Sequence, residues 1–420
     1  MSSSRLPRFV LIGSVLLLMA FVGYRQYLNW QLNRFESSLK AGRQYLAERR
    51  DELAEEQFAV CLGIRPEDAE VVMLWAESVM GGRSRTGEEA AAVVLPELAK
   101  IPDESPLAGE VRMREGRLLL LVLHRPDAAE RKLRRATQLA PEIVDSWYLL
   151  WKLYDLTNRF ERAETFFVET LRRTAPGMRA ERLRDWYLSQ FSQGAANAEL
   201  DRLMGFLGET ETAGDQTVDQ RLQDFVLQEP DSLITQTAQA AFFIQLRDRQ
   251  KALEVLQQLE THPEAYSSDW YLSLTIELLL DLGQLDEAEQ LQGKWAAEKD
   301  SYSWHRCAGR IDQVIHRDDE SAIRHFSAAQ KIWPGPTDWS LLHFQAQSAA
   351  RLGRKADSIR LREEADRIEK VTELELHRDL RILLLQPNSP QAIARMVDFY
   401  SRLGRNLEAE AWKSVGALPE

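Results

Sequence analysis

A spaced set of small and aromatic residues recurs along this chain and constrains its fold more than any other feature. Residues 320–336 read ESAIRHFSAAQKIWPGP, with Ala322, Phe326, Ala329 and Pro334 at steps of four, three and five. Steps of four and three place the first three side chains on one stripe of an α-helix. Proline cannot continue a helix, so we expect the helix to end near Pro334.

The same spacing returns elsewhere and predicts repeated helical hairpins. Residues 304–314 form an apolar-striped segment, joined to the first stripe by a short polar link, and the alanines of the stripe allow close approach of two helices. The recurring positions are Ala54, Phe58, Cys61 and Pro66, and then Ala129, Leu133, Ala136 and Pro141. Ala288, Ala322 and Ala356 are 34 residues apart. A period of this size is typical of solenoids.

The pattern resembles the tetratricopeptide repeat family, in which Trp, Leu-Gly, Tyr, Ala, Phe, Ala and Pro recur over about 34 residues. The resemblance is strongest at residues 35–68, 110–143, 144–177, 269–302 and 303–336, and looser at 69–109 and 178–232. It implies an all-α superhelical solenoid of stacked helical hairpins, in which each hairpin buries its apolar stripe against its neighbours. The hydrophobic content of 44% and the scarcity of alternating β-branched runs agree with an all-α chain.

The N-terminus has a different composition and predicts one transmembrane helix. Residues 9–24, FVLIGSVLLLMAFVGY, carry no charge and lie between Arg8 and Arg25. A helix of that length is roughly 24 Å long, slightly short of a ~30 Å hydrocarbon core, and the flanking arginines can reach the interface. A cleaved secretory signal and a buried core helix are the alternatives. The residues after the apolar run do not suit signal peptidase, and the segment is apolar all round, so we favour an uncleaved signal anchor.

The charges on the two sides of this segment leave its orientation open. Arg5, Arg8 and the α-amine precede it, whereas Arg25, Arg34 and Lys40 are among the basic residues that follow it. Because large C-terminal domains cross membranes largely regardless of such charge, we expect a single-pass protein of the plasma or inner membrane with its solenoid exported.

These patterns divide the chain into five predicted segments. They are a basic N-terminal tail at residues 1–8, a transmembrane signal anchor at 9–24, a first block of repeats at 25–177, an irregular helical segment with a polar loop at 178–232, and a second block of repeats at 233–420.

The net charge argues against binding to nucleic acid. The chain has 53 basic and 65 acidic residues, a net charge of −12, and its first 35 residues carry four arginines and no acid. The rest therefore carries −16, which repels phosphate backbones.

The sequence contains no complete catalytic or metal-binding motif. We therefore expect that the chain is not an enzyme and that it uses no cofactor, metal or small-molecule substrate. GGRSRTGEE at 81–89 has glycines at phosphate-loop spacing, but Glu88 stands where lysine is needed, so a long inter-helix turn is the better interpretation. His305 and Cys307 point about 200° apart on one helix and cannot share a metal by themselves. The seven histidines form no HxxxH motif.

The resemblance implies a concave groove, lined by the first helix of each hairpin, that binds a partner protein or peptide. The expected partner-binding side chains are Tyr148, Lys152, Ile244, Trp270, Ser273, Glu277, Trp304 and Ile311. Several of them could instead pack between repeats. We therefore expect a membrane-tethered, non-catalytic interaction scaffold, with an assembly factor or accessory subunit of an envelope enzyme complex as the alternative.

Overall fold

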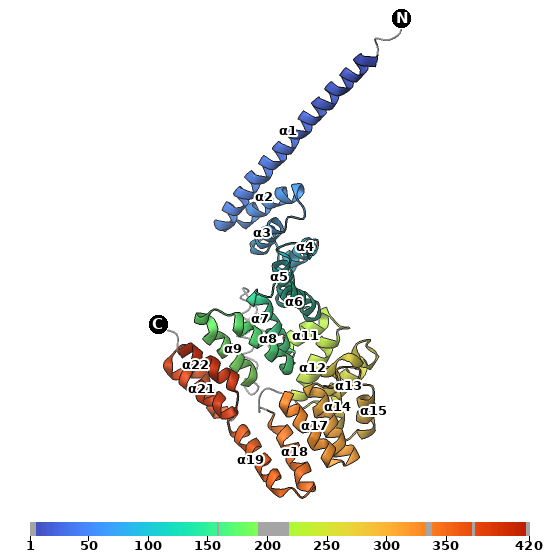
Figure 1. Ribbon diagram of the computed structural model, residues 1–420, viewed down its shortest axis with the longest axis vertical. Helices are drawn as coiled ribbons and strands as arrows, with labels where there is room; N and C mark the ends of the chain where they lie inside the picture. Colours follow the sequence, from blue (N-terminus) through green and yellow to red (C-terminus); the bar gives the residue numbers. More distant parts are fainter. Residues whose placement is uncertain (1–5, 158, 192–217, 333–337, 372–373, 417–420) are drawn as a thin grey trace. The chain divides into compact units, whose positions relative to one another are not determined.

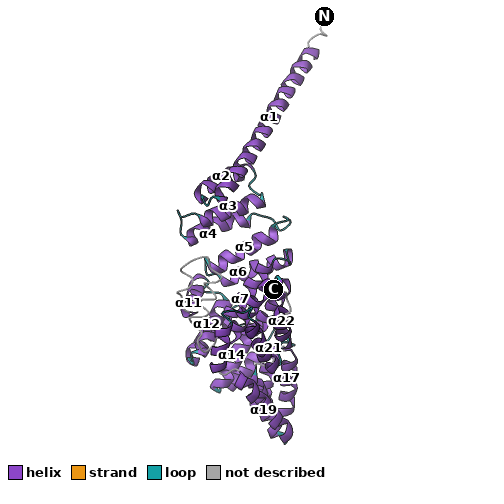
Figure 2. Cartoon of the chain, turned by 90° about the vertical axis from the view of Figure 1, so that its left-hand side faces the viewer, coloured by secondary structure: helices purple, strands orange, loops and turns teal. Residues whose placement is uncertain are grey.

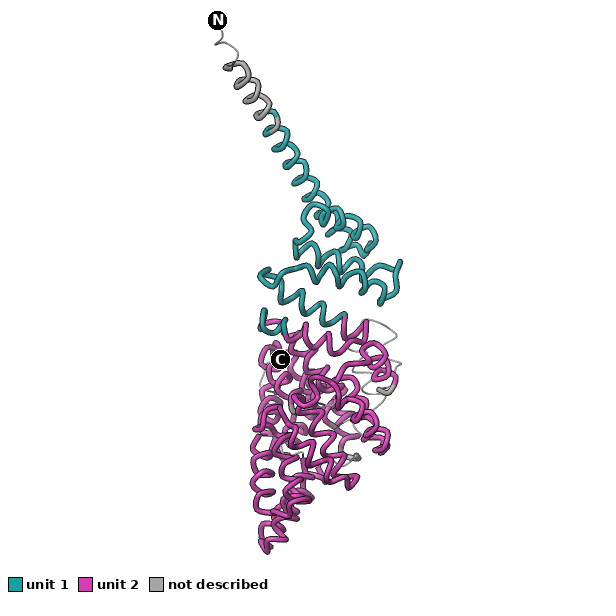
Figure 3. Tube along the Cα trace, turned by 90° about the vertical axis from the view of Figure 1, so that its right-hand side faces the viewer, with its two compact units in different colours: residues 1–118, 135–141 teal, residues 119–134, 142–420 magenta. Residues whose placement is uncertain are grey.

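Every regular element in the described part of the chain is a helix, which confirms the all-α prediction. The computed structural model describes residues 6–157, 159–191, 218–332, 338–371 and 374–416. The chain divides into two compact units, of which one comprises residues 1–118 and 135–141 and the other residues 119–134 and 142–420 (Figure 3). Each unit is built from helical hairpins that pack side by side along the chain (Figure 2).

Unit 1 begins with a long helix and continues with shorter ones. Its elements are α1 (Leu6–Ala47), α2 (Asp51–Ile64), α3 (Ala69–Gly81), α4 (Gly87–Ala99), most of α5 (Ala108–Leu121) and the end of α6 (Pro126–Leu139). Helices α1 and α2 pair, as do α2 and α3, and then α3 and α4. The fully buried stripe of α2 consists of Ala54, Phe58 and Cys61, three positions of the recurring sequence pattern.

Unit 2 contains the remaining described helices. They are α7 (Val144–Leu156), α8 (Phe160–Arg173), α9 (Arg179–Phe191), α11 (Val218–Gln228), α12 (Leu233–Gln245), α13 (Arg249–Gln258), α14 (Asp269–Leu282), α15 (Leu285–Gly293), α16 (Tyr302–Ile311), α17 (Asp319–Ile332), α18 (Trp339–Arg351), α19 (Lys355–Val371), α20 (Leu374–Leu383), α21 (Pro390–Leu403) and α22 (Asn406–Gly416). Short 3₁₀ turns lie at Pro176–Met178, Leu259–Thr261 and Ala265–Ser267, and one π-helical turn lies at Asp312–His316.

Two glycines on first helices allow close contact with the recurring aromatic residue of the second helix. A Cβ atom added at Gly309 on α16 would lie 2.5 Å from the Phe326 ring on α17, and one added at Gly42 on α1 would lie 2.6 Å from the Phe58 ring on α2. Distances this short cannot be accommodated without movement of the ring. The aromatic side chain of the second helix therefore packs directly against the backbone of the first, and this contact limits how closely the two helices approach.

Enlarging a small buried residue of α17 should destabilise the same hairpin. Ala322 on α17 is fully buried, so Ala322→Leu adds atoms to a filled space, and we expect a loss of about 1–3 kcal/mol in the free energy of unfolding. Lys331→Leu is the control, because Lys331 is exposed on the same helix. Urea denaturation of both variants measures the difference. Equal stability of the two variants would show that the helices are not closely packed at Ala322.

The C-terminal hairpin of unit 2 returns to helices formed more than 200 residues earlier (Figure 1). Helix α22 packs on α9, and Trp186 Nε1 donates a hydrogen bond of 3.1 Å to Glu408. Arg405 at the start of α22 donates to Glu164 on α8 at 2.9 Å and to Glu408 through Nε at 2.9 Å. All three charged side chains are buried. The apolar stripes thus stack between neighbours as predicted, and a buried polar cluster joins α8 and α9 to α22.

Two further contacts connect the beginning of unit 2 with its middle. The carboxylate of Glu229, after α11, accepts hydrogen bonds from the backbone N–H groups of Asp127 and Ala128 at 2.8 and 3.1 Å. These are unpaired donors in the first turn of α6, where a negative charge is favourable. Arg162 on α8 donates to both carboxylate oxygens of Asp269, at 3.1 Å each. Helix α8 is therefore tied to both α14 and α22.

The predicted transmembrane segment, residues 9–24, forms part of α1, and most of its side chains lie outside the described residues. Among the residues that the structure describes, no helix combines the length and the apolar character needed to cross a bilayer. The described side chains of α1 include a series of large exposed apolar groups, namely Met19, Phe21, Val22, Tyr24, Tyr27, Leu28, Trp30 and Leu32.

The predicted segment 178–232 is described only in part. Its first portion forms α9 and its last portion forms α11, whereas residues 192–217, which include the polar loop, lie outside the described residues. The two compact units divide elsewhere, near residues 118 and 141, and the five predicted segments stay a prediction.

Candidate interaction surface

The first helices of three successive hairpins, α14, α16 and α18, are joined by charged side chains. Arg306 on α16 donates through Nε to Glu277 on α14 at 3.0 Å, and Arg310, one turn later, donates to the other oxygen of Glu277 at 3.0 Å. Arg310 also donates to Asp281 at 3.2 Å. Two guanidinium groups of one helix thus hold two carboxylates of the preceding first helix.

The same arginines reach forward to α18. Arg306 and the Tyr302 hydroxyl both donate to Asp338, which also caps α18 by accepting from the backbone N–H of Leu341 at 3.2 Å. Burial acts to raise the pKa of Asp338, but the Arg306 charge and the hydrogen bonds outweigh it and hold that pKa below its usual value. The Arg310 guanidinium lies 4.3 Å from the centre of the Phe344 ring.

We call this set of side chains the first-helix ladder. It consists of Glu277, Asp281, Arg306, Arg310, Asp338 and Phe344. Its two arginines face three carboxylates, and each of these side chains is held by more than one partner, so their positions are fixed before any ligand arrives. All except the buried Arg310 remain partly or fully exposed. A surface of this kind offers aromatic and fork-shaped polar groups in a set geometry, which is useful for recognising a folded or helical segment.

Four of the eight predicted partner-binding residues are partly exposed on α14 and α16. Trp270, Ser273 and Glu277 lie on α14, and Trp304 lies on α16. Glu277 belongs to the first-helix ladder. The Trp304 ring meets the buried Trp295 edge-on at 5.2 Å, and Lys299 lies 5.1 Å from its centre, so much of the indole is used in packing.

Of the other four predicted residues, Ile244 is also partly exposed and three are buried. Ile311 is buried in the core of unit 2, and Ile244 packs against the same core. Tyr148 and Lys152 are buried on α7. The partner-binding role of all eight residues stays a prediction.

Tyr148 and Lys152 belong to a separate buried cluster between α7 and α9. The Tyr148 hydroxyl donates to Asp185 at 3.4 Å, and Lys152 Nζ lies 4.2 Å from the centre of the Trp151 ring, with no hydrogen-bond partner among the described residues. Burial lowers the pKa of Lys152, although Asp185 and Asp155 act against this. Burial also raises the pKa of Asp155 to about 6.

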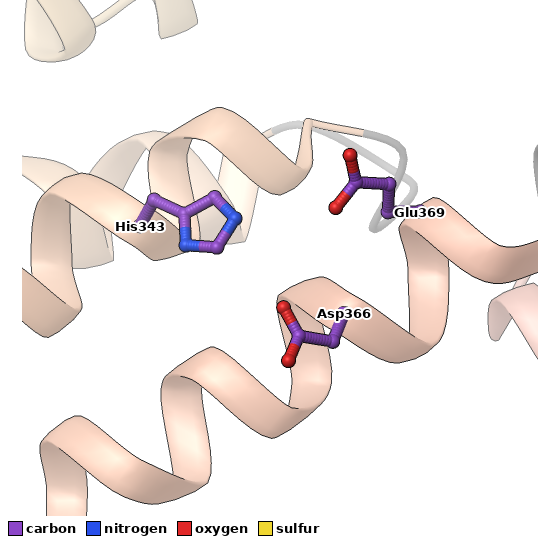
Figure 4. Close-up of side chains that lie close together, drawn as sticks. All are labelled: His343, Asp366 and Glu369. Atoms are coloured by element: carbon purple, nitrogen blue, oxygen red, sulfur yellow. The ribbon is translucent and has the colours of Figure 1, made fainter.

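One group of side chains on α18 and α19 has ligand types suited to a metal ion. The nitrogen of His343 and the carboxylate oxygens of Asp366 and Glu369 lie within 4.8 Å of one another (Figure 4). Both carboxylates are exposed and lie on one side of the His343 ring, which also contacts Trp339 edge-on at 5.7 Å. Exposed acids near a histidine are common on helical surfaces, and the geometry alone does not make this group a site.

The glycine-containing stretch at residues 81–89 is an inter-helix turn, as the missing lysine indicates. Thr86 accepts from the backbone N–H of Glu89, and the Glu89 carboxylate accepts from that of Thr86, which forms a capping box at the start of α4. Arg85 pairs with Glu55 through two hydrogen bonds of 2.9 and 3.0 Å. Both features stabilise the turn and leave no cradle for a phosphate.

Sequence reasoning missed Arg306, Arg310, Asp338 and Phe344. For the two arginines the sequence does contain a signal. They are one turn apart on a first helix, and Glu277 and Asp281 are one turn apart on the preceding first helix. Aligning the hairpins by their 34-residue period would have placed these opposite charges on neighbouring helices.

Similar proteins were found among solved structures and not among family models or curated sequences. The sequence matches no protein-family model and no curated protein. Among solved structures, a tetratricopeptide repeat protein from Parabacteroides merdae is 10% identical, covers 75% of this chain and 99% of its own, and has a TM-score of 0.27.

Two other solved structures are similar at the same level. The human IFIT1 dimer with PPP-AAAA is 14% identical, with coverages of 79% and 95% and a TM-score of 0.32. The P58(IPK) TPR domain is 17% identical, with coverages of 85% and 99% and a TM-score of 0.27. Likeness at these TM-scores carries no argument, so the description of stacked hairpins rests on the contacts inside this chain.

Proposed function

We propose that this chain is a membrane-tethered, non-catalytic scaffold that binds a partner protein across its first helices α14, α16 and α18. The observation that carries the proposal is the first-helix ladder, which joins three successive first helices through paired side chains, most of which are partly exposed. Solenoids of stacked hairpins present extended surfaces of this kind to other proteins.

The charge of the chain supports a protein partner with basic character. The residues after position 35 carry a net charge of −16, which steers basic partners toward the surface and repels phosphate backbones. Within the ladder the two arginines offset all but one of the three carboxylate charges. Contact there would depend on Phe344, Trp270 and the aromatic Tyr302, since aromatic side chains usually contribute most of the interface energy.

Site-specific photo-crosslinking in membranes tests the proposed surface. A photoreactive residue at Ser273 on α14 should yield a crosslinked partner, because Ser273 lies beside the ladder on the same helix. The matched control is Glu287, which is exposed on the second helix α15. Equal adducts at both positions, or adducts at Glu287 alone, would argue against the first-helix surface. A single stoichiometric partner from an enzyme complex would favour the accessory-subunit alternative over a scaffold with several partners.

The proposed tether is supported by the apolar side chains of α1. Phe21 and Trp30 are 63% and 55% exposed, and the neighbouring large apolar groups are exposed as well. Leaving so many apolar groups in water is unfavourable by roughly 25 cal/mol per Å² of apolar surface. Insertion of residues 9–24 into a bilayer, with Tyr24, Tyr27 and Trp30 at the interface, removes this cost.

Fractionation tests the tether independently of the partner. The full chain should stay with membranes after an alkaline wash, and a variant that lacks residues 1–26 should be released into the supernatant. Recovery of a mature chain that begins near residue 23 or 24 would show cleavage and would contradict the anchor. So would release of the full chain by the alkaline wash.

A further inference from the structure

Three of the seven histidines lie close together on one hairpin of unit 2. His305 on α16 and His325 on α17 face each other with their Nδ1 atoms 3.0 Å apart. His316 lies between them in sequence, in the π-helical turn Asp312–His316, a type of distortion that is frequent at functional sites. Both facing imidazoles are partly buried.

Carboxylates lie on the far side of each of the two facing rings. Asp300 Oδ1 is 3.1 Å from His305 Nε2, and Asp312 Oδ2 is 3.8 Å from His325 Nε2. The other oxygen of Asp312 is 2.9 Å from His316 Nδ1, and Glu289 is 2.8 Å from His316 Nε2. His316 is therefore a donor at both nitrogens, which raises its pKa, chiefly through Glu289 and then Asp312.

Asp300 determines which nitrogen of the His305 ring carries hydrogen. An imidazole that points Nε2 at a carboxylate keeps its proton there, and its Nδ1 then presents a lone pair. His305 is in this form, and the opposing nitrogen 3.0 Å away, His325 Nδ1, can donate its hydrogen to that lone pair. A metal ion can take the place of this hydrogen when His325 carries its proton at Nε2, which faces Asp312 at 3.8 Å.

The separation of the nitrogens is close to that in a zinc site. At Zn–N distances of 2.0–2.1 Å, two tetrahedral ligands lie about 3.4 Å apart, so a shift of about 0.4 Å from the observed 3.0 Å separation is sufficient. Histidines that bind metal almost always donate their other N–H group to a carboxylate or carbonyl, which fixes the ring and increases its basicity. Asp300 and Asp312 are placed for this role.

We propose that His305 and His325 bind a divalent transition metal ion, such as Zn²⁺, through their Nδ1 atoms. Asp300 and Asp312 orient the two rings, and the remaining coordination positions are open to water. Both imidazoles must be neutral to bind the ion. The ion connects α16 to α17 near the first-helix ladder, since Arg306 directly follows His305 in the chain. The proposal stands independently of the proposed partner surface.

Zinc titration of the full chain, purified in detergent without an affinity tag, tests the proposal. Calorimetry should detect one saturable site in the wild-type protein. His305→Ala and His325→Ala should each weaken binding at least about tenfold, and Asp312→Asn should weaken it by about 10–100-fold through loss of ring orientation. His343→Ala is the control and should leave the affinity unchanged, because His343 belongs to the other group of potential ligands on α18 and α19.

A second readout keeps the test valid if a variant fails to fold. In wild-type protein labelled on its histidine rings, added zinc should shift the NMR signals of His305 and His325 and leave that of His262 in place. The proposal is overturned by the absence of saturable zinc binding, by loss of binding in His343→Ala with retention in His305→Ala, or by zinc shifts that avoid both facing rings.

Discussion

Replacing Arg405 with methionine is expected to lower the free energy of unfolding of unit 2 by about 3–5 kcal/mol. The Arg405 side chain is 1% exposed and lies between the carboxylates of Glu164 and Glu408. Methionine fills a similar length without charge, so above a pH of about 7, where Glu164 is ionised, both buried carboxylates lose their counter-ion and most of their hydrogen bonds. Removing one partner from a buried ionic group is costly because the desolvation of the remaining charges is no longer offset.

The chain contains its own matched control for this substitution. The tetrapeptide RLGR occurs at residues 351–354 and 402–405, with the central glycine at a φ of 75° in both copies. Arg354 occupies the position of Arg405, but its side chain is 43% exposed and pairs with an exposed Glu320. Arg354→Met should therefore cost less than about 1 kcal/mol. Urea denaturation followed by tryptophan fluorescence compares the two, and similar losses would contradict a special role for Arg405.

The stability of unit 2 should also fall as the pH rises from about 5 to 7. Burial, assisted by the nearby Glu408 and opposed by Arg405, raises the pKa of Glu164 to about 7 from its ordinary value of 4.5. Between these two values the folded chain holds a proton that the unfolded chain releases. Stability therefore decreases with rising pH in this interval, by about 3 kcal/mol in total for a difference of this size.

Glu164→Gln isolates this contribution from other titrating groups. Glutamine imitates the protonated acid, so the variant should lose most of the decline in stability between pH 5 and 7. Arg405 stays charged throughout, and burial raises the pKa of Tyr400 far above this range. Glu169→Gln on the same helix is the control and should keep the decline. An unchanged decline in Glu164→Gln would contradict the assignment.

The hairpins could be predicted from sequence because their packing is local and periodic. Ala322, Phe326 and Ala329 are all fully buried, as their spacing indicates. The reason lies in helix geometry: residues three and four apart share a face, and a repeat unit must bury that face against its neighbours. Gly309, which allows the Phe326 ring to approach, carries no such periodic signal and was found only in the structure.

The buried ionic cluster could not be predicted for a different reason. Arg405 and Arg354 have the same local sequence, yet one is buried and the other is exposed. Their difference depends on Glu164 and Trp186, which lie more than 200 residues away in the chain and follow no repeat. Local patterns contain no information about which distant helix covers a polar turn.

The candidate surfaces were predicted only in part, because the side chains that complete them come from neighbouring helices. Assigning Trp270, Ser273 and Glu277 to one helix was possible from the repeat, whereas the pairing of Glu277 with Arg306 and Arg310 depends on the neighbouring hairpin. The sequence suggested Cys307, on the same helix, as a neighbour of His305. Its partner in the structure is His325, twenty residues later on the facing helix.

The return of α22 to α8 and α9 has a consequence for how the protein is made. A repeat array that contacts only its neighbours can complete each hairpin as it leaves the ribosome. Here Glu164 meets Arg405 across 241 residues, so the charged side of α8 stays without its counter-ion until the C-terminus is synthesised. At about 5–20 residues per second, this delay is roughly ten to fifty seconds. During that time α8 and α9 expose the surface that α22 later covers, and nascent chains halted before residue 405 should be bound by chaperones at these two helices.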